Sequence, residues 1–189
     1  EINRMLSVGM LIKKAMKGHI DFINPATKVA DELMGIPSFE VPDLTELFAQ
    51  EKLILTNLKK IFLMLAGAGI KKFGDKLEEH QQMLLAVSDI LIEIYMTESA
   101  LLRTEKNCNR LGKETQTNQI AMTQLYLYKA VDIIQSKGKE VIVSFSSGDE
   151  QKGLLMGLKR FTKYYEYPNV IELKNIIAEK LKEENKYCF

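Results

Sequence analysis

The stretch at residues 58–74, LKKIFLMLAGAGIKKFG, decides the fold of this chain. It continues an apolar stripe that recurs every three or four positions, which is the spacing of one helix face. Gly74 is suited to a C-terminal cap, so the pattern predicts a helix from about residue 44 to residue 73. No charge interrupts Ile61 to Ile70, so this helix either lies at the centre of the fold or contacts a second partner. The stripe consists of Leu47, Ile54, Leu58, Ile61, Leu65 and Ala68.

Two further long helices are predicted downstream, at residues 80–107 and 118–146. Each carries apolar residues on one side at helical spacing, and a polar segment with Gly112 separates them. Val141-Ile142-Val143 has the β-branched composition of a strand, but the helical phase continues through it and favours helix. The stripes contain Leu84, Val87, Leu91, Ile94 and Leu101 in the first helix, and Ile120, Leu127, Val131, Ile134, Val141 and Phe145 in the second.

Shorter helices are predicted at both ends of the chain. A first helix ends near Pro25, because the residue before proline disfavours helical geometry, and residues 26–34 form a short second one. Two more close the chain, and three helix starts carry a candidate capping box. We therefore predict an all-α fold, an antiparallel helix bundle with a short helical extension. The candidate boxes are Asp43 with Glu46, Ser147 with Glu150, and Asn169 with Glu172.

Composition excludes several classes of function. A net charge of +1 provides no field that would attract nucleic acid, so no nucleic-acid partner is expected. The uncharged apolar run from Ile61 to Ile70 is shorter than the ~20 residues that span a bilayer. Cys108 and Cys188 form no motif, which is typical of free thiols in a reducing compartment, and we expect a cytoplasmic protein.

The motifs of common catalytic and metal sites are absent from the sequence. A di-metal bundle needs Glu-x-x-His twice, but Met16 and Leu77 stand three residues before His19 and His80, so no metal site is predicted. Asp89 and Glu93 could pair on one helix, although a solvated helix face is the favoured interpretation. Gly67 and Gly69 fit no nucleotide-binding fingerprint. They indicate instead a close approach of another helix, for which we expect the helix at residues 80–107.

The start of the chain indicates a longer parent protein. Residue 1 is Glu, and a helical pattern begins at once with no preceding cap or turn. We therefore interpret the sequence as part of a larger polypeptide. The residues at helical spacing are Ile2, Met5, Leu6, Gly9, Ile12, Met16 and Ile20.

The opening run Glu1-Ile2-Asn3-Arg4-Met5-Leu6 resembles the second half of a motif of acyl-CoA dehydrogenases, which reads Glu-Gly-Thr-Ser/Asn-Gln-Ile-Gln-Arg. The following residues are similar to the extra C-terminal region of the very-long-chain type, most closely up to about Arg110. Further landmarks in order are Asn24-Pro25, the run from Leu65 to Gly74, and the run from Ile94 to Arg103.

The resemblance implies that the parent enzyme is FAD-dependent and oxidises the Cα–Cβ bond of a fatty acyl-CoA. Its catalytic Glu opens the Glu-Gly-Thr run and would lie upstream of Glu1. Glu1 stands where the family has Gln, near the adenine end of the flavin, and is the cofactor-binding candidate of this chain. A carboxylate there cannot donate the hydrogen bonds of an amide. The chain alone is expected to bind no FAD, to have no catalytic residue and to be inactive.

The resemblance also implies a domain organisation. Residues 1–25 would end a catalytic-domain helix, residues 26–42 would connect, and residues 43–189 would form the C-terminal bundle. That bundle would contact the catalytic portion of the same protein and support a homodimer. In the very-long-chain enzyme the connecting segment helps membrane attachment, but here Lys28 stands against Asp31, Glu32 and Glu40, which disfavours membrane association. The alternative function is a stand-alone helical scaffold or adaptor that binds a partner protein.

Overall fold

The computed structural model describes residues 2–35 and 43–186, so Glu1, the extended connector predicted at residues 36–42, and Cys188 lie outside the described residues. No strand occurs in the part that is described, which confirms the all-α prediction, including helix at Val141-Ile142-Val143. The elements are α1 (Ile2–Met16), α2 (Ile23–Met34), α3 (Ala49–Phe73), the 3₁₀ helix η1 (Gly74–Glu79), α4 (Gln81–Leu111), the 3₁₀ helix η2 (Lys113–Gln116), α5 (Thr117–Phe145), α6 (Gly148–Phe161) and α7 (Val170–Glu184).

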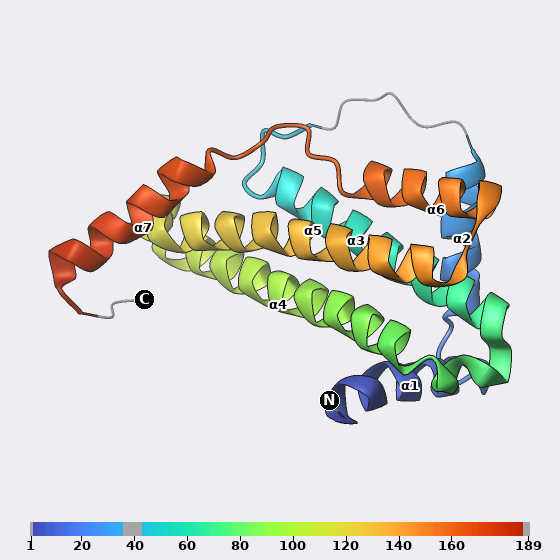
Figure 1. The fold of residues 1–189 in the computed structure, drawn as a ribbon. Helices are drawn as coiled ribbons and strands as arrows, with labels where there is room; N and C mark the ends of the chain where they lie inside the picture. Colours follow the sequence, from blue (N-terminus) through green and yellow to red (C-terminus); the bar gives the residue numbers. More distant parts are fainter. Residues whose placement is uncertain (1, 36–42, 187–189) are drawn as a thin grey trace.

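Four helices, α3 to α6, form an antiparallel bundle (Figure 1). The helices α1 and α2 lie across one end of it, and α7 extends from the other end. The predicted bundle with a short extension is therefore confirmed. The extension is one helix rather than two, because α6 packs back onto α3 and α5. Its side chains Leu158 and Phe161 are each 1% exposed and complete the core.

Helix α3 is the centre of the molecule, since it contacts α2, α4, α5 and α6. Leu58, Ile61 and Leu65 of its apolar stripe are fully buried, which confirms a buried centre rather than a surface for a partner. With η1 it forms a segment, Ala49–Glu79, that is long and apolar enough to cross a membrane. Half of its most apolar window is buried inside the bundle, and the core helix of a soluble protein passes the same test of length and composition.

Several helix ends differ from the prediction. The first helix ends at Met16 and not near Pro25, because Gly18 follows in the left-handed region at φ +72°. Pro25 lies instead in the first turn of α2, where its missing N–H would have no helical partner. Helix α4 continues to Leu111, four residues beyond the predicted end, and Gly112 then leads into η2.

One of the three predicted caps forms a side-chain hydrogen bond. Asn169 Oδ1 accepts a hydrogen bond from the Glu172 backbone N–H at 3.2 Å, whereas Ser147 precedes α6 without one. Asp43 does not begin α3. Its carboxylate accepts hydrogen bonds from the Thr45 hydroxyl at 2.7 Å and backbone N–H at 2.9 Å, which lower its pKa. The helix begins five residues later than predicted, at Ala49.

The glycines of α3 face two different neighbours. A Cβ on Gly69 would lie 2.5 Å from Met83 Cε of α4, as expected for a close approach of that helix. A Cβ on Gly67 would lie 3.1 Å from Ala26 Cβ of α2, so the expectation that α4 is its neighbour is wrong. The Cβ of Ala26 cannot rotate away, and relief there requires movement of the α2 backbone.

We therefore expect Gly67→Leu and Gly69→Leu each to lower the free energy of unfolding by about 1–3 kcal/mol, because a large side chain would overpack both sites. Chemical denaturation of each variant measures the change. Unchanged or raised midpoints for both variants would show that the helices can move apart at this turn without cost.

Candidate functional site

The two histidines do not form a catalytic or metal site. His19 lies in the exposed turn after α1, and the ring of His80 lies on that of Phe73, with centroids 3.7 Å apart. Within the described residues, no group of three or more His, Cys, Asp or Glu could hold a metal ion. Cys108 is a buried free thiol whose pKa is raised by desolvation. None of these groups indicates an active site.

Asp89 and Glu93 tie neighbouring helices together instead of forming a solvated face. The Asp89 carboxylate pairs with Arg4 of α1 and lies 3.9 Å from Lys137 Nζ of α5. Glu93 accepts a hydrogen bond from the Tyr126 hydroxyl at 2.9 Å. Burial, and then this bond, raises the pKa of Tyr126 to about 12. The favoured interpretation of these two carboxylates was wrong, because each one has a partner on another helix.

Helix α1 is fixed to the bundle along its inner side. Val8, Ile12 and Ala15 are at most 6% exposed. Beside them the hydroxyls of Ser7 and the fully buried Ser88 of α4 lie 3.0 Å apart, and Arg4 pairs with Asp89. Apolar burial and polar contacts together therefore determine which side of α1 faces outward.

The outer side of α1 carries a line of exposed apolar residues. Ile2 is 71% exposed, Leu6 51% and Met10 53%, and their spacing of four places them next to one another along the helix. We call these three residues the α1 stripe. Scattered exposed apolar residues are ordinary, but a contiguous row of them is typical of an interaction site.

A groove of about 310 Å³ lies between α1 and η1. Its walls include apolar side chains of both elements, and Lys13 Nζ and Glu78 Oε1 form an ion pair of 2.7 Å beside it. The groove adds apolar surface next to α1 at this end of the bundle. The apolar lining residues are Ile12, Met16, Leu77 and Leu84.

Sequence periodicity did not separate the two sides of α1. It placed Ile2, Leu6 and Ile12 on one face, whereas the structure exposes the first two and buries the third. One signal in the sequence could have shown that α1 has two apolar sides. Val8 and Met10 are apolar, although neither belongs to the predicted apolar face. Glu1, the cofactor-binding candidate, lies outside the described residues, so its role stays a prediction.

A family model described as "Acyl-CoA dehydrogenase, C-terminal domain" matches residues 57–160, which is more than half of the chain and includes most of the four-helix bundle. The chain therefore belongs to the acyl-CoA dehydrogenase C-terminal domain family.

Two proteins that are similar to this chain are much longer than it. It is 33% identical over 187 residues to a probable acyl-CoA dehydrogenase of Bacillus subtilis (strain 168), covering 99% of this chain and 31% of that protein. It is also similar to the crystal structure of an acyl-CoA dehydrogenase complexed with FAD from Bacillus anthracis. That match has a TM-score of 0.92 and 34% identity, and it covers all of this chain and 32% of the other. The chain thus spans about a third of the length of these relatives.

Proposed function

We propose that this chain is the C-terminal helical part of an FAD-dependent acyl-CoA dehydrogenase of the very-long-chain type, which introduces the α,β double bond into a fatty acyl-CoA. Family membership and the threefold greater length of the relatives support this proposal. The role of the chain itself is structural. It docks on the catalytic portion of the same protein and contributes to a homodimer, while the catalytic base belongs to the portion that precedes it.

Neither of the two hollows among the described residues suits the pyrophosphate of FAD, which needs positive charge or free backbone N–H groups. The groove beside α1 is lined by Lys13 and Lys17 and also by Asp75 and Glu78, so its lining has no excess of positive charge. A second hollow, between α3 and α7, is lined by carboxylates without a lysine or arginine among its described lining residues. We therefore assign no flavin contact to the lining of either hollow.

The observation that carries the docking role is the α1 stripe. The opposite side of α1 is buried in the bundle and contacts α4 through Ser7 and Ser88. The stripe therefore cannot be buried in the core of this domain. Covering exposed Ile, Leu and Met side chains with another apolar surface removes them from water and lowers the free energy. The catalytic portion of the parent enzyme is the partner that the family assignment provides.

Met10→Glu tests this proposal. In the full-length protein that carries this chain, we expect it to lower the free energy of unfolding by at least about 1.5 kcal/mol, because a charge would enter an apolar interface. In the 189-residue chain alone, where Met10 is 53% exposed, the change should stay within about 0.5 kcal/mol. Chemical denaturation of both proteins measures the difference.

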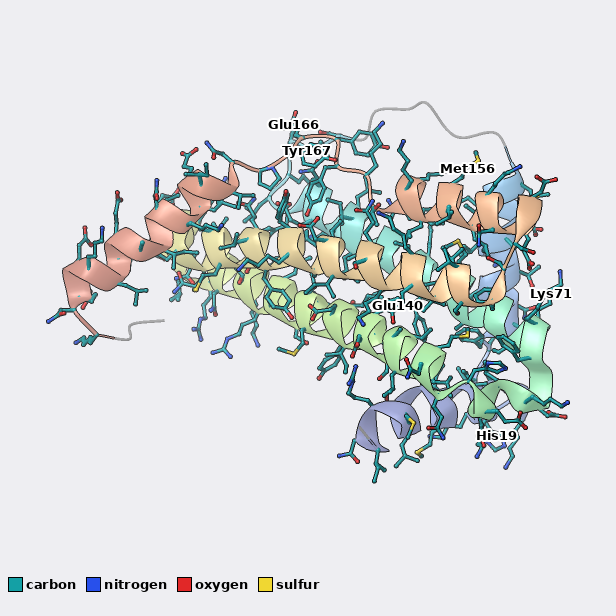
Figure 2. The ribbon with its side chains drawn as sticks, viewed as in Figure 1. His19, Lys71, Glu140, Met156, Glu166 and Tyr167 are labelled. Carbon is teal, nitrogen blue, oxygen red and sulfur yellow. The ribbon has the colours of Figure 1, made fainter. Side chains whose placement is uncertain are left out.

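Met156→Glu is the matched control. Met156 lies on the outer side of α6 and is 73% exposed (Figure 2), so the same substitution should have little effect in either protein. Equal stability of the two full-length variants would contradict docking through the α1 stripe. It would favour a scaffold whose stripe binds a separate protein.

A further inference from the structure

The outer side of α4 divides into an apolar half and a basic half. The apolar half is 43% exposed at Ile92, 68% at Tyr95 and 48% at Met96, which lie three and four residues apart on one side of the helix. The same side continues with exposed basic residues and extends for about 27 Å in all, at 1.5 Å per residue. We call this surface the α4 face. It consists of Ile92, Tyr95 and Met96 in its apolar half and of Arg103, Lys106 and Arg110 in its basic half.

The positive charge of the α4 face is not neutralised by the carboxylates of the same helix. Each carboxylate of α4 instead has a partner on another helix, whereas the three basic residues of the face form no ion pair within the described residues. They follow one another at spacings of three and four, where like charges repel. Carboxylates of a partner would relieve this repulsion. The pairs of α4 are Asp89 with Arg4, Glu93 with Tyr126, Glu98 with Lys59, and Glu105 with Lys52.

The apolar half of the α4 face begins beside the α1 stripe. Arg4 of α1 pairs with Asp89 of α4. The first turn of α1, which carries Ile2, therefore lies next to the turn of α4 that leads to Ile92. Figure 1 shows α1 alongside the first half of α4. The two apolar surfaces adjoin, so a partner that covers the α1 stripe also reaches the α4 face.

The order of the residues on the α4 face favours a protein surface over a lipid bilayer. A helix that lies on a membrane has basic residues on its polar side and a continuous apolar side along its length. In α4 the apolar and the basic residues instead follow one another along the helix axis. A bilayer surface is uniform in that direction, whereas a protein surface can change from apolar to acidic over a few residues.

We propose that the α4 face docks on the catalytic portion of the parent enzyme, on a surface that is apolar at one end and rich in carboxylates at the other. This inference rests on the proposed docking of the α1 stripe and adds a second contact of stated chemistry. The apolar end would exclude water from Tyr95 and Met96. At the acidic end, carboxylates would accept paired hydrogen bonds from Arg103 and Arg110, which fix the orientation of the domain as well as its position.

Tyr95 and Tyr167 are a matched pair for testing this contact, because they are 68% and 69% exposed in the domain itself. Tyr167 lies on the segment between α6 and α7, outside the α4 face (Figure 2). In the full-length protein, we expect hydroxyl-radical footprinting to modify Tyr95 about tenfold more slowly than Tyr167, because the core of an interface is packed like a protein interior. Modification of Tyr95 as fast as Tyr167 would overturn the proposal. If Met10→Glu still destabilised that protein, docking through α1 would stand and only the contact through α4 would fail.

Carbodiimide cross-linking tests the basic half of the α4 face. In the full-length protein, we expect peptide mass spectrometry to find an amide between Lys106 Nζ and a carboxylate of the catalytic portion. Arg103→Glu combined with Arg110→Glu should abolish this amide, because the new charges repel an acidic surface. Lys159→Glu combined with Lys174→Glu makes the same change of charge at exposed positions on α6 and α7 and should leave the amide in place. An amide that persists in the first double variant would overturn the proposal.

Two further results would assign the α4 face to a different occupant and overturn the proposal. Mixed ¹⁴N- and ¹⁵N-labelled proteins reveal a cross-link between copies. An amide from Lys106 to a carboxylate within residues 1–189 of another copy would show that a second copy of this domain covers the face. Protection of Tyr95 only after addition of phosphatidylserine and phosphatidylcholine vesicles would show that the face lies on a membrane.

Discussion

Leu65→Ala is expected to lower the free energy of unfolding by about 2–5 kcal/mol, because Leu65 is fully buried at the centre of α3. Four helices enclose α3, so the surrounding side chains cannot collapse into the space that the substitution leaves. Urea denaturation, with the slope of the transition fitted separately for each protein, measures this change.

Leu102→Ala controls for the same loss of side-chain atoms. Leu102 lies on α4 and is 56% exposed, so its replacement should change the stability by about 0.5 kcal/mol or less. Comparable losses in the two variants would show that α3 is not the centre on which the other helices pack.

Gly157→Leu is the second substitution for which we expect a large loss, about 1–3 kcal/mol. A Cβ at this position would lie 2.7 Å from Leu33 Cδ2 of α2 and 2.9 Å from Met64 Sδ of α3. Three helices meet closely at this glycine, and a leucine side chain has no space between them. Thermal or chemical denaturation reports the effect.

Gly153→Leu provides a comparison one turn earlier on the same helix. A Cβ on Gly153 would have no neighbour within 4 Å, so leucine adds helix propensity without a clash and should raise the stability by up to about 1 kcal/mol. The two variants should therefore shift the midpoint in opposite directions. A rise in both would mean that α6 does not pack tightly on α2 and α3.

The long helices were predictable because each has a continuous apolar side of helical period. Residues 118–146 were predicted and Thr117–Phe145 are observed. The start of α3 was not predictable from local chemistry. Asp43 has the residue type of a cap but bonds to Thr45, and the helix begins only after Phe48, which adopts φ 64°. Phe48 is 3% exposed, so tertiary burial accompanies a backbone conformation that its own propensity opposes.

The α1 stripe and the hollow between α3 and α7 could not be derived from sequence, for different reasons. The α1 stripe is apolar like the buried side of the same helix, and only the packed structure shows which side is covered. The hollow between α3 and α7 brings Glu51 together with Glu166 and Glu172, which lie more than a hundred residues further along the chain, and they meet only because α6 folds back along the bundle. A single sequence gives no period or spacing that connects them.

The burial of α3 and the exposure of α7 mean that the domain does not open as one unit. Helix α7 has no fully buried residue and contacts mainly α5, so it can separate while the rest of the chain stays folded. The backbone amides of α7 should exchange hydrogen through such local openings, whereas the amides of α3 should exchange only when the whole domain unfolds. Gln50 of α3 forms hydrogen bonds to the backbone of Tyr165 and Glu166, so the segment before α7 should stay attached to the bundle when α7 separates.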